Sequence, residues 1–138
     1  MDILIIERKL ESLRRCIKRV ELKRPDTASV LENDPDIQDI LVLNLSRAVQ
    51  LCVDIGAHLL VDYDVPPPNT MGETFDRLVQ LEIISSSLSE KLKKSVGFRN
   101  MAVHNYDVLD WNIVFAIAQH HLDDFTGFAA ATMAIIEA

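Results

Sequence analysis

An all-helical bundle is the fold that this chain of 138 residues predicts. Over most of the sequence, apolar residues recur three and four positions apart, a spacing that places them on one face of an α-helix. Alternation of apolar and polar residues, which is typical of strands, never continues for more than a few positions. Only four Gly and five Pro are present. We therefore expect about five helices that form a single domain over residues 1–138.

The first helix is expected to run from the N-terminus to about Arg24-Pro25. Its apolar residues are separated alternately by three and four positions, with charged residues between them. Such a stripe is typical of a helix that packs on a core, although a basic amphipathic helix can also bind a membrane surface. The stripe consists of Ile3, Ile6, Leu10, Leu13, Ile17 and Val20.

A long second helix is predicted to begin at Asp34, Pro35 and Asp36. Asp can cap a helix, Pro is tolerated in the first turn, and a further carboxylate is favourable at the positive end of the helix dipole. The apolar face continues to about Tyr63, before three consecutive prolines at 66–68. A helix of about 28 residues is about 42 Å long, which suits the spine of a bundle.

Two capping-box signals follow the prolines. Thr70 and Glu73 predict the start of a short third helix, and Ser87 and Glu90 predict the start of a fourth. Gly97 is expected to break or bend this fourth helix, so that the residues after it lie at or just beyond the helix end.

The last helix is expected to extend to the C-terminal region from a cap at Asp107 or Asp110. Small residues near its end permit close approach of another helix, either in the core or in a second subunit. These residues are Ala129, Ala130, Ala131 and Ala134.

The net charge of −7 has the wrong sign for a protein that coats nucleic acid, and it weighs against non-specific binding of RNA or DNA over a broad surface. The charges are unevenly distributed, because residues 1–25 hold eight of the fourteen Lys and Arg residues. A second basic group lies within residues 91–99. These groups are interpreted either as two patches that flank a functional site or as ordinary solvated helix faces.

Cysteine usage and the N-terminus predict a cytoplasmic protein. Cys16 and Cys52 are far apart and form no C-x-x-C motif, so we expect two buried thiols. Residues 1–6 are too short an apolar run for a signal peptide, and no run of about 18 apolar residues is present. We expect no membrane association.

The strongest chemical signal lies within residues 99–106. Arg99 offers a planar set of donors that matches phosphate oxygens, and His104 carries a side chain that exchanges a proton near neutral pH. These are the groups that metal-free cleavage of a phosphodiester requires. In a regular helix the two side chains are about 140° apart, so a distorted helix or a second subunit is needed to combine them.

The pattern R-x4-H-x-Y in a small, all-helical chain resembles the HEPN superfamily, and in particular the HepT-type ribonuclease toxins that are paired with a minimal nucleotidyltransferase antitoxin. The resemblance implies a homodimer whose catalytic cleft is formed by both subunits. It further implies a metal-independent endoribonuclease that needs no cofactor and cuts mRNA or tRNA.

The resemblance makes Arg99 and His104 the catalytic residues. In our hypothesis the RNA 2′-OH attacks the adjacent phosphorus, His104 acts as general base or acid, and Arg99 stabilises the developing charge. Asn100 and Asn105 either orient the phosphate or His104, or act as helix caps.

Tyr106 occupies the position at which HepT-type toxins accept AMP from the partner nucleotidyltransferase. AMP at this position adds negative charge beside the catalytic residues, so it is expected to repel an RNA phosphate and block the site. The structural alternative is a partly buried phenol that packs on Trp111 or Phe98.

Two alternative interpretations remain, one a metal site and the other a different function. Asp54 with His58, or His120 and His121 with the acids at 123–124, offer the side chains of a metal site, but no E-x-x-H pattern accompanies them, and we expect no bound metal. The rival function is a catalytically inert HEPN module that binds a nucleotidyltransferase and presents substrate or nucleotide to it. The intact pair of Arg99 and His104 favours the enzyme, whereas the acidic net charge favours the inert module.

Overall fold

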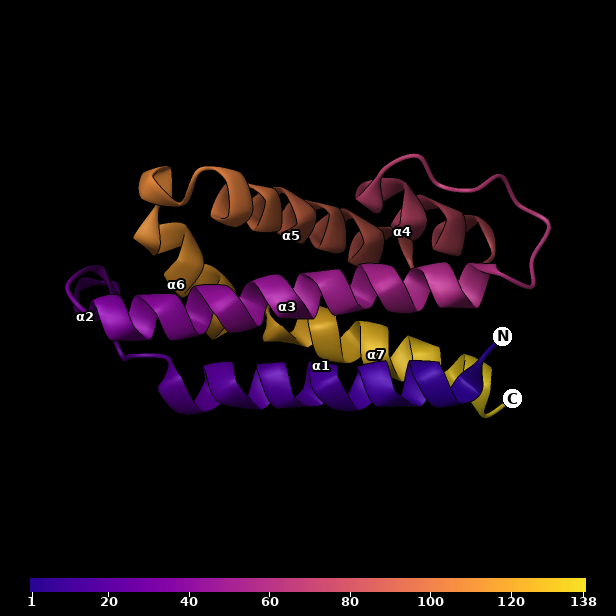
Figure 1. The fold of residues 1–138 in the computed structure, drawn as a ribbon, viewed down its shortest axis with the longest axis horizontal. Helices are drawn as coiled ribbons and strands as arrows, with labels where there is room; N and C mark the ends of the chain where they lie inside the picture. The colour runs from indigo at the N-terminus through magenta and orange to yellow at the C-terminus, as the bar shows by residue number, and fades with distance from the viewer.

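The computed structural model describes all 138 residues, which form seven α-helices, one 3-10 turn and no strand (Figure 1). The all-α class is therefore confirmed. The elements in chain order are α1 (Ile3–Lys23), α2 (Ala28–Glu32), α3 (Pro35–Leu60), α4 (Met71–Gln80), α5 (Ser86–His104), η1 (Tyr106–Val108), α6 (Trp111–His120) and α7 (Leu122–Ile136).

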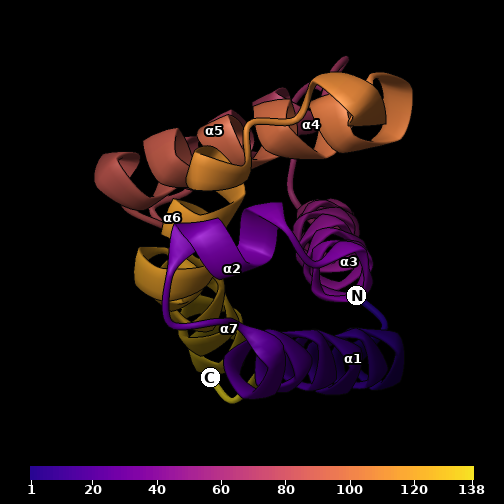
Figure 2. The same cartoon turned by 90° about the vertical axis from the view of Figure 1, so that its left-hand side faces the viewer.

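Helix α3 is the spine of the bundle and contacts each of the other six α-helices. It lies between α1 on one side and α4 and α5 on the other (Figures 1 and 2). By length and composition alone α3 resembles a membrane span, but 56% of its most apolar window is buried inside the fold. This burial is the environment of a core helix.

A single cluster of 29 buried apolar residues forms the core. Five of the six residues in the predicted α1 stripe belong to it, whereas Ile3 is exposed. Cys16 and Cys52 are also buried, as expected, and burial raises the pKa of both thiols. Phe75 of α4 and Phe128 of α7 meet edge to face with ring centroids 5.9 Å apart.

Most of the predicted helix starts are confirmed. The side chains of Asp34, Thr70 and Asp110 accept hydrogen bonds from backbone N–H groups at the starts of α3, α4 and α6. The predicted cap at Ser87 is wrong, because Ser85 caps α5 instead. Residues 85–87 are all Ser and offer the same hydroxyl, so the sequence pattern alone does not select one of them.

The number of helices differs from the expected five at two places. Helix α2 was missed because its five residues are too few to carry a periodic signal. The predicted last helix is divided at His121, which has φ −121° and ψ 9°. The predicted break at Gly97 is also wrong, because α5 continues through this residue to His104. Its φ is not positive, so Gly97 has no special backbone role.

Candidate active site

The last two turns of α5 carry the candidate catalytic residues. Phe98 and Ala102 are buried against the core and fix the orientation of this end of the helix. Arg99, which lies between these two residues, is half-buried, and His104, which follows them, is exposed. His104 is the final residue of α5, so its imidazole is open to a ligand from outside the subunit.

The two asparagines have different structural roles. The Asn100 Oδ1 accepts a hydrogen bond of 3.2 Å from Arg99 Nη1, which restrains the guanidinium at the surface. Asn105 is the C-cap of α5, and its backbone N–H donates to Met101 O at 2.8 Å. Asn105 therefore lies at the cap position, through its backbone only, whereas the Asn100 side chain does something that neither alternative described, because it holds the neighbouring cation.

Arg99 and His104 are not brought together within one subunit. They are five positions apart in an uninterrupted helix, which places their side chains about 140° apart around its axis. The distorted helix that was one of the two expected solutions is absent. A single subunit therefore presents the cation and the imidazole on different sides of α5.

Tyr106 begins the 3-10 turn η1, directly after the α5 cap. Its hydroxyl donates a hydrogen bond of 2.7 Å to Asp39 Oδ1 in α3. Its ring packs edge-on against Trp111, with centroids 5.9 Å apart, as the structural alternative expected. Burial, together with the hydrogen bond and charge of Asp39, raises the pKa of Tyr106 to about 12. The phenol oxygen is nevertheless at the surface.

Asp39 belongs to the site through its hydrogen bond to Tyr106, although no sequence pattern indicates it. It is exposed, lies in the second turn of α3, and is 67 positions from its tyrosine partner. Acidic residues near a helix start are common for electrostatic reasons alone. No local pattern therefore distinguishes Asp39 from its neighbour Asp36.

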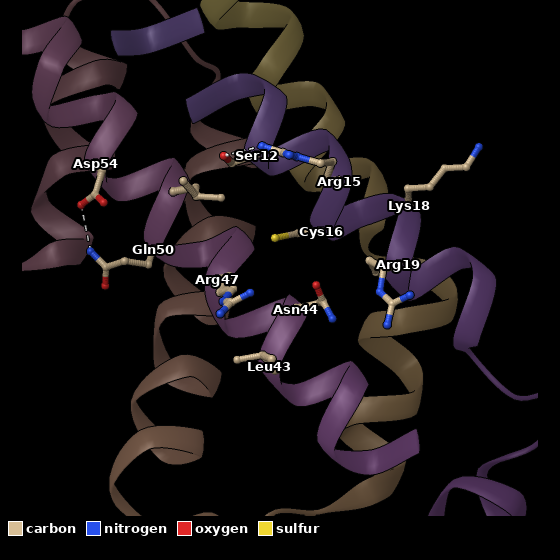
Figure 3. Close-up of a pocket in the computed structure, with 11 residues that line it drawn as sticks. Ser12, Arg15, Cys16, Lys18, Arg19, Leu43, Asn44, Arg47, Gln50 and Asp54 are labelled. Carbon is tan, nitrogen blue, oxygen red and sulfur yellow. Dashed lines mark hydrogen bonds between the residues drawn. The ribbon is translucent and has the colours of Figure 1, made fainter. Parts of the chain in front are cut away.

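A hollow of about 770 Å³ lies between α1 and α3 (Figure 3). Four of its lining side chains are cations: Arg15, Lys18 and Arg19 from α1, and Arg47 from α3. None of the four forms an ion pair with a carboxylate. We call this hollow the basic groove. It concentrates positive charge on a protein of net charge −7.

The two basic groups do not flank the motif as a pair within one subunit. Helix α1 packs on α3 and α7, whereas α5 packs on the opposite side of α3 (Figure 1). In the second group, Lys91 and Lys94 are exposed on α5 itself. Lys93 instead forms ion pairs with Asp76 at 3.0 Å and Glu90 at 3.3 Å, which raise its pKa.

The alternative histidine sites are used for local contacts. Asp54 Oδ1 accepts a hydrogen bond of 2.9 Å from Gln50 Nε2, and its other oxygen is 3.7 Å from Lys9 Nζ. His121 Nδ1 is 3.3 Å from Asp124 Oδ2. No group of three or more His, Cys, Asp or Glu residues is arranged to hold a metal ion.

An apolar groove of about 590 Å³ separates α5 from α6 beside the motif. Phe98 and Met101 of α5 form part of one wall, and Ile113 of α6 forms part of the other. Met101, Val108 and Ile113 are large apolar side chains that remain exposed here.

Comparison with known proteins gives the same family from sequence and from structure. A family described as Ribonuclease HepT-like matches residues 6–132. An mRNA nuclease HepT from Shewanella oneidensis is 40% identical over 124 residues, which are 90% of this chain and 92% of the relative. A tRNA nuclease HepT from Aphanizomenon flos-aquae is 28% identical over 127 residues, which are 91% of this chain and 85% of the relative.

Solved structures are similar over nearly the full length. A tri-AMPylated HEPN toxin of Shewanella oneidensis in complex with an MNT antitoxin is 38% identical, with a TM-score of 0.88. The match covers 94% of this chain and 97% of the toxin chain. A toxin-antitoxin complex with AMP-PNP is also 38% identical, with a TM-score of 0.89 and coverage of 94% and 98%.

Proposed function

This chain belongs to the HepT-like ribonuclease family, and from that membership we propose that it is an endoribonuclease toxin neutralised by a nucleotidyltransferase antitoxin. The main support is the 40% identity to an mRNA nuclease over 90% of the chain, together with an intact R-x4-H-x-Y pattern. The relatives named as an mRNA nuclease and a tRNA nuclease define RNA as the substrate class. The protein acts in the cytoplasm, where RNA and ATP are both present.

The chemistry is transesterification within the RNA strand. His104 takes the proton of a 2′-OH, the 2′ oxygen attacks the adjacent phosphorus, and the bond to the 5′ oxygen breaks. His104, now protonated, returns that proton to the leaving 5′ oxygen. Arg99 stabilises the charge on the phosphoryl oxygens, and Asn100 holds Arg99 in position. The reaction needs no metal and leaves a cyclic phosphate.

The active form is a homodimer in which Arg99 of one subunit works with His104 of the other. The continuous α5 helix supports this arrangement, because it separates the two side chains by about 140° within one subunit. The apolar groove between α5 and α6 gives a second subunit a surface to cover beside the motif.

Tyr106 is the acceptor for AMP from the antitoxin. Support comes from its surface hydroxyl, its position two residues after His104, and the tri-AMPylated state of the Shewanella oneidensis toxin. Each AMP adds a phosphodiester anion near the catalytic residues, where it repels and obstructs the RNA phosphate. The modified toxin is therefore inactive.

The proposal is tested by RNA cleavage with purified wild-type and His104→Ala protein in EDTA. Both mRNA and tRNA serve as substrates, and the fragment ends are analysed chemically. We expect wild-type cleavage with cyclic phosphate ends and a loss of about 10²–10⁴ in the variant. Cleavage that needs an added divalent metal contradicts the mechanism.

The acidic net charge favours one other function, that of a catalytically inert partner module. In that case the chain binds the nucleotidyltransferase and presents substrate or nucleotide to it. Clean wild-type protein then cuts neither RNA, whereas it still binds the partner.

A further inference from the structure

Asp39 makes a direct hydrogen bond to the atom that accepts AMP. Its Oδ1 is 2.7 Å from the hydroxyl of Tyr106, within the range required of a general base. We propose that Asp39 is the general base that removes the phenol proton during AMP transfer. This proposal rests on the function proposed for Tyr106 and adds the group that makes its oxygen a nucleophile.

The step balances with ATP as the co-reactant, bound by the antitoxin. The phenol oxygen of Tyr106 forms a bond to the α-phosphorus, and the bond from that phosphorus to the oxygen bridging to the β-phosphorus breaks. Pyrophosphate leaves with the electron pair of the broken bond. The phenol proton moves to Asp39 Oδ1 and is later released to water.

A base is needed because the phenol does not ionise by itself near neutral pH. Burial and the Asp39 carboxylate favour its neutral form, which raises its pKa to about 12. A neutral hydroxyl is a weak nucleophile until a neighbouring group accepts its proton. Protein kinases solve the same problem with an aspartate that accepts the substrate hydroxyl proton. Because Asp39 is exposed, the nucleotide can approach the pair from solvent.

The test is steady-state AMP transfer from ATP by the purified antitoxin to wild-type and Asp39→Asn toxin, followed by mass spectrometry of the Tyr106 peptide. Asn keeps an oxygen that accepts the phenol hydrogen bond but does not take the proton. We expect kcat to fall by about 10²–10⁴ while KM for the toxin stays unchanged. Asp39→Glu restores part of the rate. Asp36→Asn, at an exposed acid one turn away, is the matched control and keeps the wild-type rate.

The outcomes separate the two proposals. A wild-type rate for Asp39→Asn, or an effect on KM alone, overturns the role of Asp39 and leaves Tyr106 as the acceptor. No added mass on wild-type Tyr106 overturns the acceptor assignment and the role of Asp39 together. Thermal unfolding of each variant, with a midpoint equal to that of the wild type, shows that the fold is intact.

The basic groove carries a second, independent inference. Its four cations form no ion pair, and Asp54, the one acid that lines the groove, instead contacts Gln50 and Lys9, so the groove has an excess of positive charge that a bound anion would offset. Guanidinium groups, which three of the four carry, bind phosphate oxygens through paired hydrogen bonds. Amide side chains of Asn44 and Gln50 also line the groove and add neutral hydrogen-bonding groups (Figure 3).

The α3 wall of the groove lies on the same side of that helix as Asp39, the hydrogen-bond partner of Tyr106. Asp39, Arg47 and Gln50 lie within about 80° of one another around the α3 axis, so they share one side of the helix. Arg47 is about 12 Å from Asp39 along that axis. We infer that the groove binds the phosphodiester backbone of a single RNA strand whose continuation enters the active site. This inference rests on the proposed ribonuclease activity.

Binding of a fluorescent single-stranded RNA at several salt concentrations tests the groove. All proteins carry His104→Ala so that the RNA is not cut. We expect Arg19→Gln with Arg47→Gln to weaken binding about tenfold at low salt and to reduce the salt slope by about 1.4, which is two phosphate contacts. The control pair is Arg8→Gln with Lys23→Gln, two exposed α1 cations outside the groove, and it leaves the slope unchanged.

Three results contradict the groove assignment. Equal losses in the two pairs show a general charge effect, and no loss in either pair shows that RNA does not use the groove. Unchanged RNA affinity with weaker antitoxin binding assigns the groove to a protein partner. If the His104→Ala protein without groove substitutions binds no RNA, and the wild type cuts none, then the proposed ribonuclease activity itself is wrong.

Discussion

The hydroxyl of Tyr106 donates a 2.7 Å hydrogen bond to Asp39, which joins the turn after α5 to the second turn of α3. AMP on the phenol oxygen removes the only hydrogen that this oxygen donates. It also places a phosphodiester anion against a carboxylate, which is unfavourable. Modification is therefore expected to release residues 106–108 from α3 as well as to add charge beside His104.

The ionisation of Tyr106 is expected to depend on Asp39. The pKa of this phenol is raised to about 12, and loss of the carboxylate in Asp39→Asn is expected to lower it toward its usual value of 10. The measurement is an absorbance titration of phenolate in a Tyr63→Phe background, where Tyr106 is the only tyrosine left. Identical titration curves with and without Asp39 contradict this expectation.

The raised pKa also predicts a loss of stability at high pH. In the unfolded chain Tyr106 releases its proton near pH 10, whereas the folded protein retains it to about pH 12. The unfolded state is therefore favoured increasingly as pH rises from 10 to 12. Urea unfolding across this range measures the decline, which is expected to be shallower in Tyr106→Phe. A decline of equal slope in both proteins assigns it to other groups.

Hybrid dimers test whether the active site is shared between subunits. Arg99→Ala and His104→Ala are each expected to lose at least about 10²-fold in cleavage rate. Co-expression of the two variants with different purification tags yields hybrids in which one site retains both residues. We expect these hybrids to recover up to half of the wild-type rate. Hybrids as inactive as either parent show that the two residues do not combine across the interface.

Two glycines are expected to respond to alanine in opposite directions. A Cβ at Gly56 in α3 lies 2.6 Å from Cγ2 of Thr74 and 3.3 Å from Cδ1 of Leu78. Thr74 is buried and β-branched, so it has little freedom to move. Gly56→Ala is expected to destabilise the fold by about 1–3 kcal/mol.

Gly97→Ala is the matched control for that substitution. Nothing lies within 4 Å of its Cβ position, and Gly97 is inside an uninterrupted helix. Alanine is therefore expected to stabilise the protein by about 0.5–1 kcal/mol. Urea unfolding of both variants provides the free energies. Gly97 also lines the apolar groove, so destabilisation there means that a second subunit packs against this glycine.

Much of the fold could be predicted because its signals are local. The apolar stripe of α1 and the caps at Asp34, Thr70 and Asp110 each depend on residues within about one turn of one another. Helix α2 and the division at His121 could not be predicted in this way. A five-residue helix is shorter than two turns, and at His121 the apolar period continues although the backbone turns.

The candidate site likewise contains some residues that local sequence predicts and others that only the folded chain brings together. Arg99, His104 and Tyr106 lie within eight consecutive residues, and their chemistry is visible in the residue types alone. Asp39 is joined to Tyr106 only by the packing of η1 on α3, and no spacing rule connects residues 67 positions apart. The basic groove likewise combines cations of α1 with Arg47 of α3, so it exists only in the folded chain.

The most direct single measurement follows RNA cleavage and Tyr106 mass in the same sample, during incubation of the wild-type protein with purified antitoxin and ATP. We expect cleavage to fall in proportion to the fraction of Tyr106 that carries AMP. We also expect Tyr106→Phe, treated identically, to gain no mass and to continue cutting RNA. Full cleavage by protein that is completely modified at Tyr106 contradicts the proposed silencing of the Arg99 and His104 site.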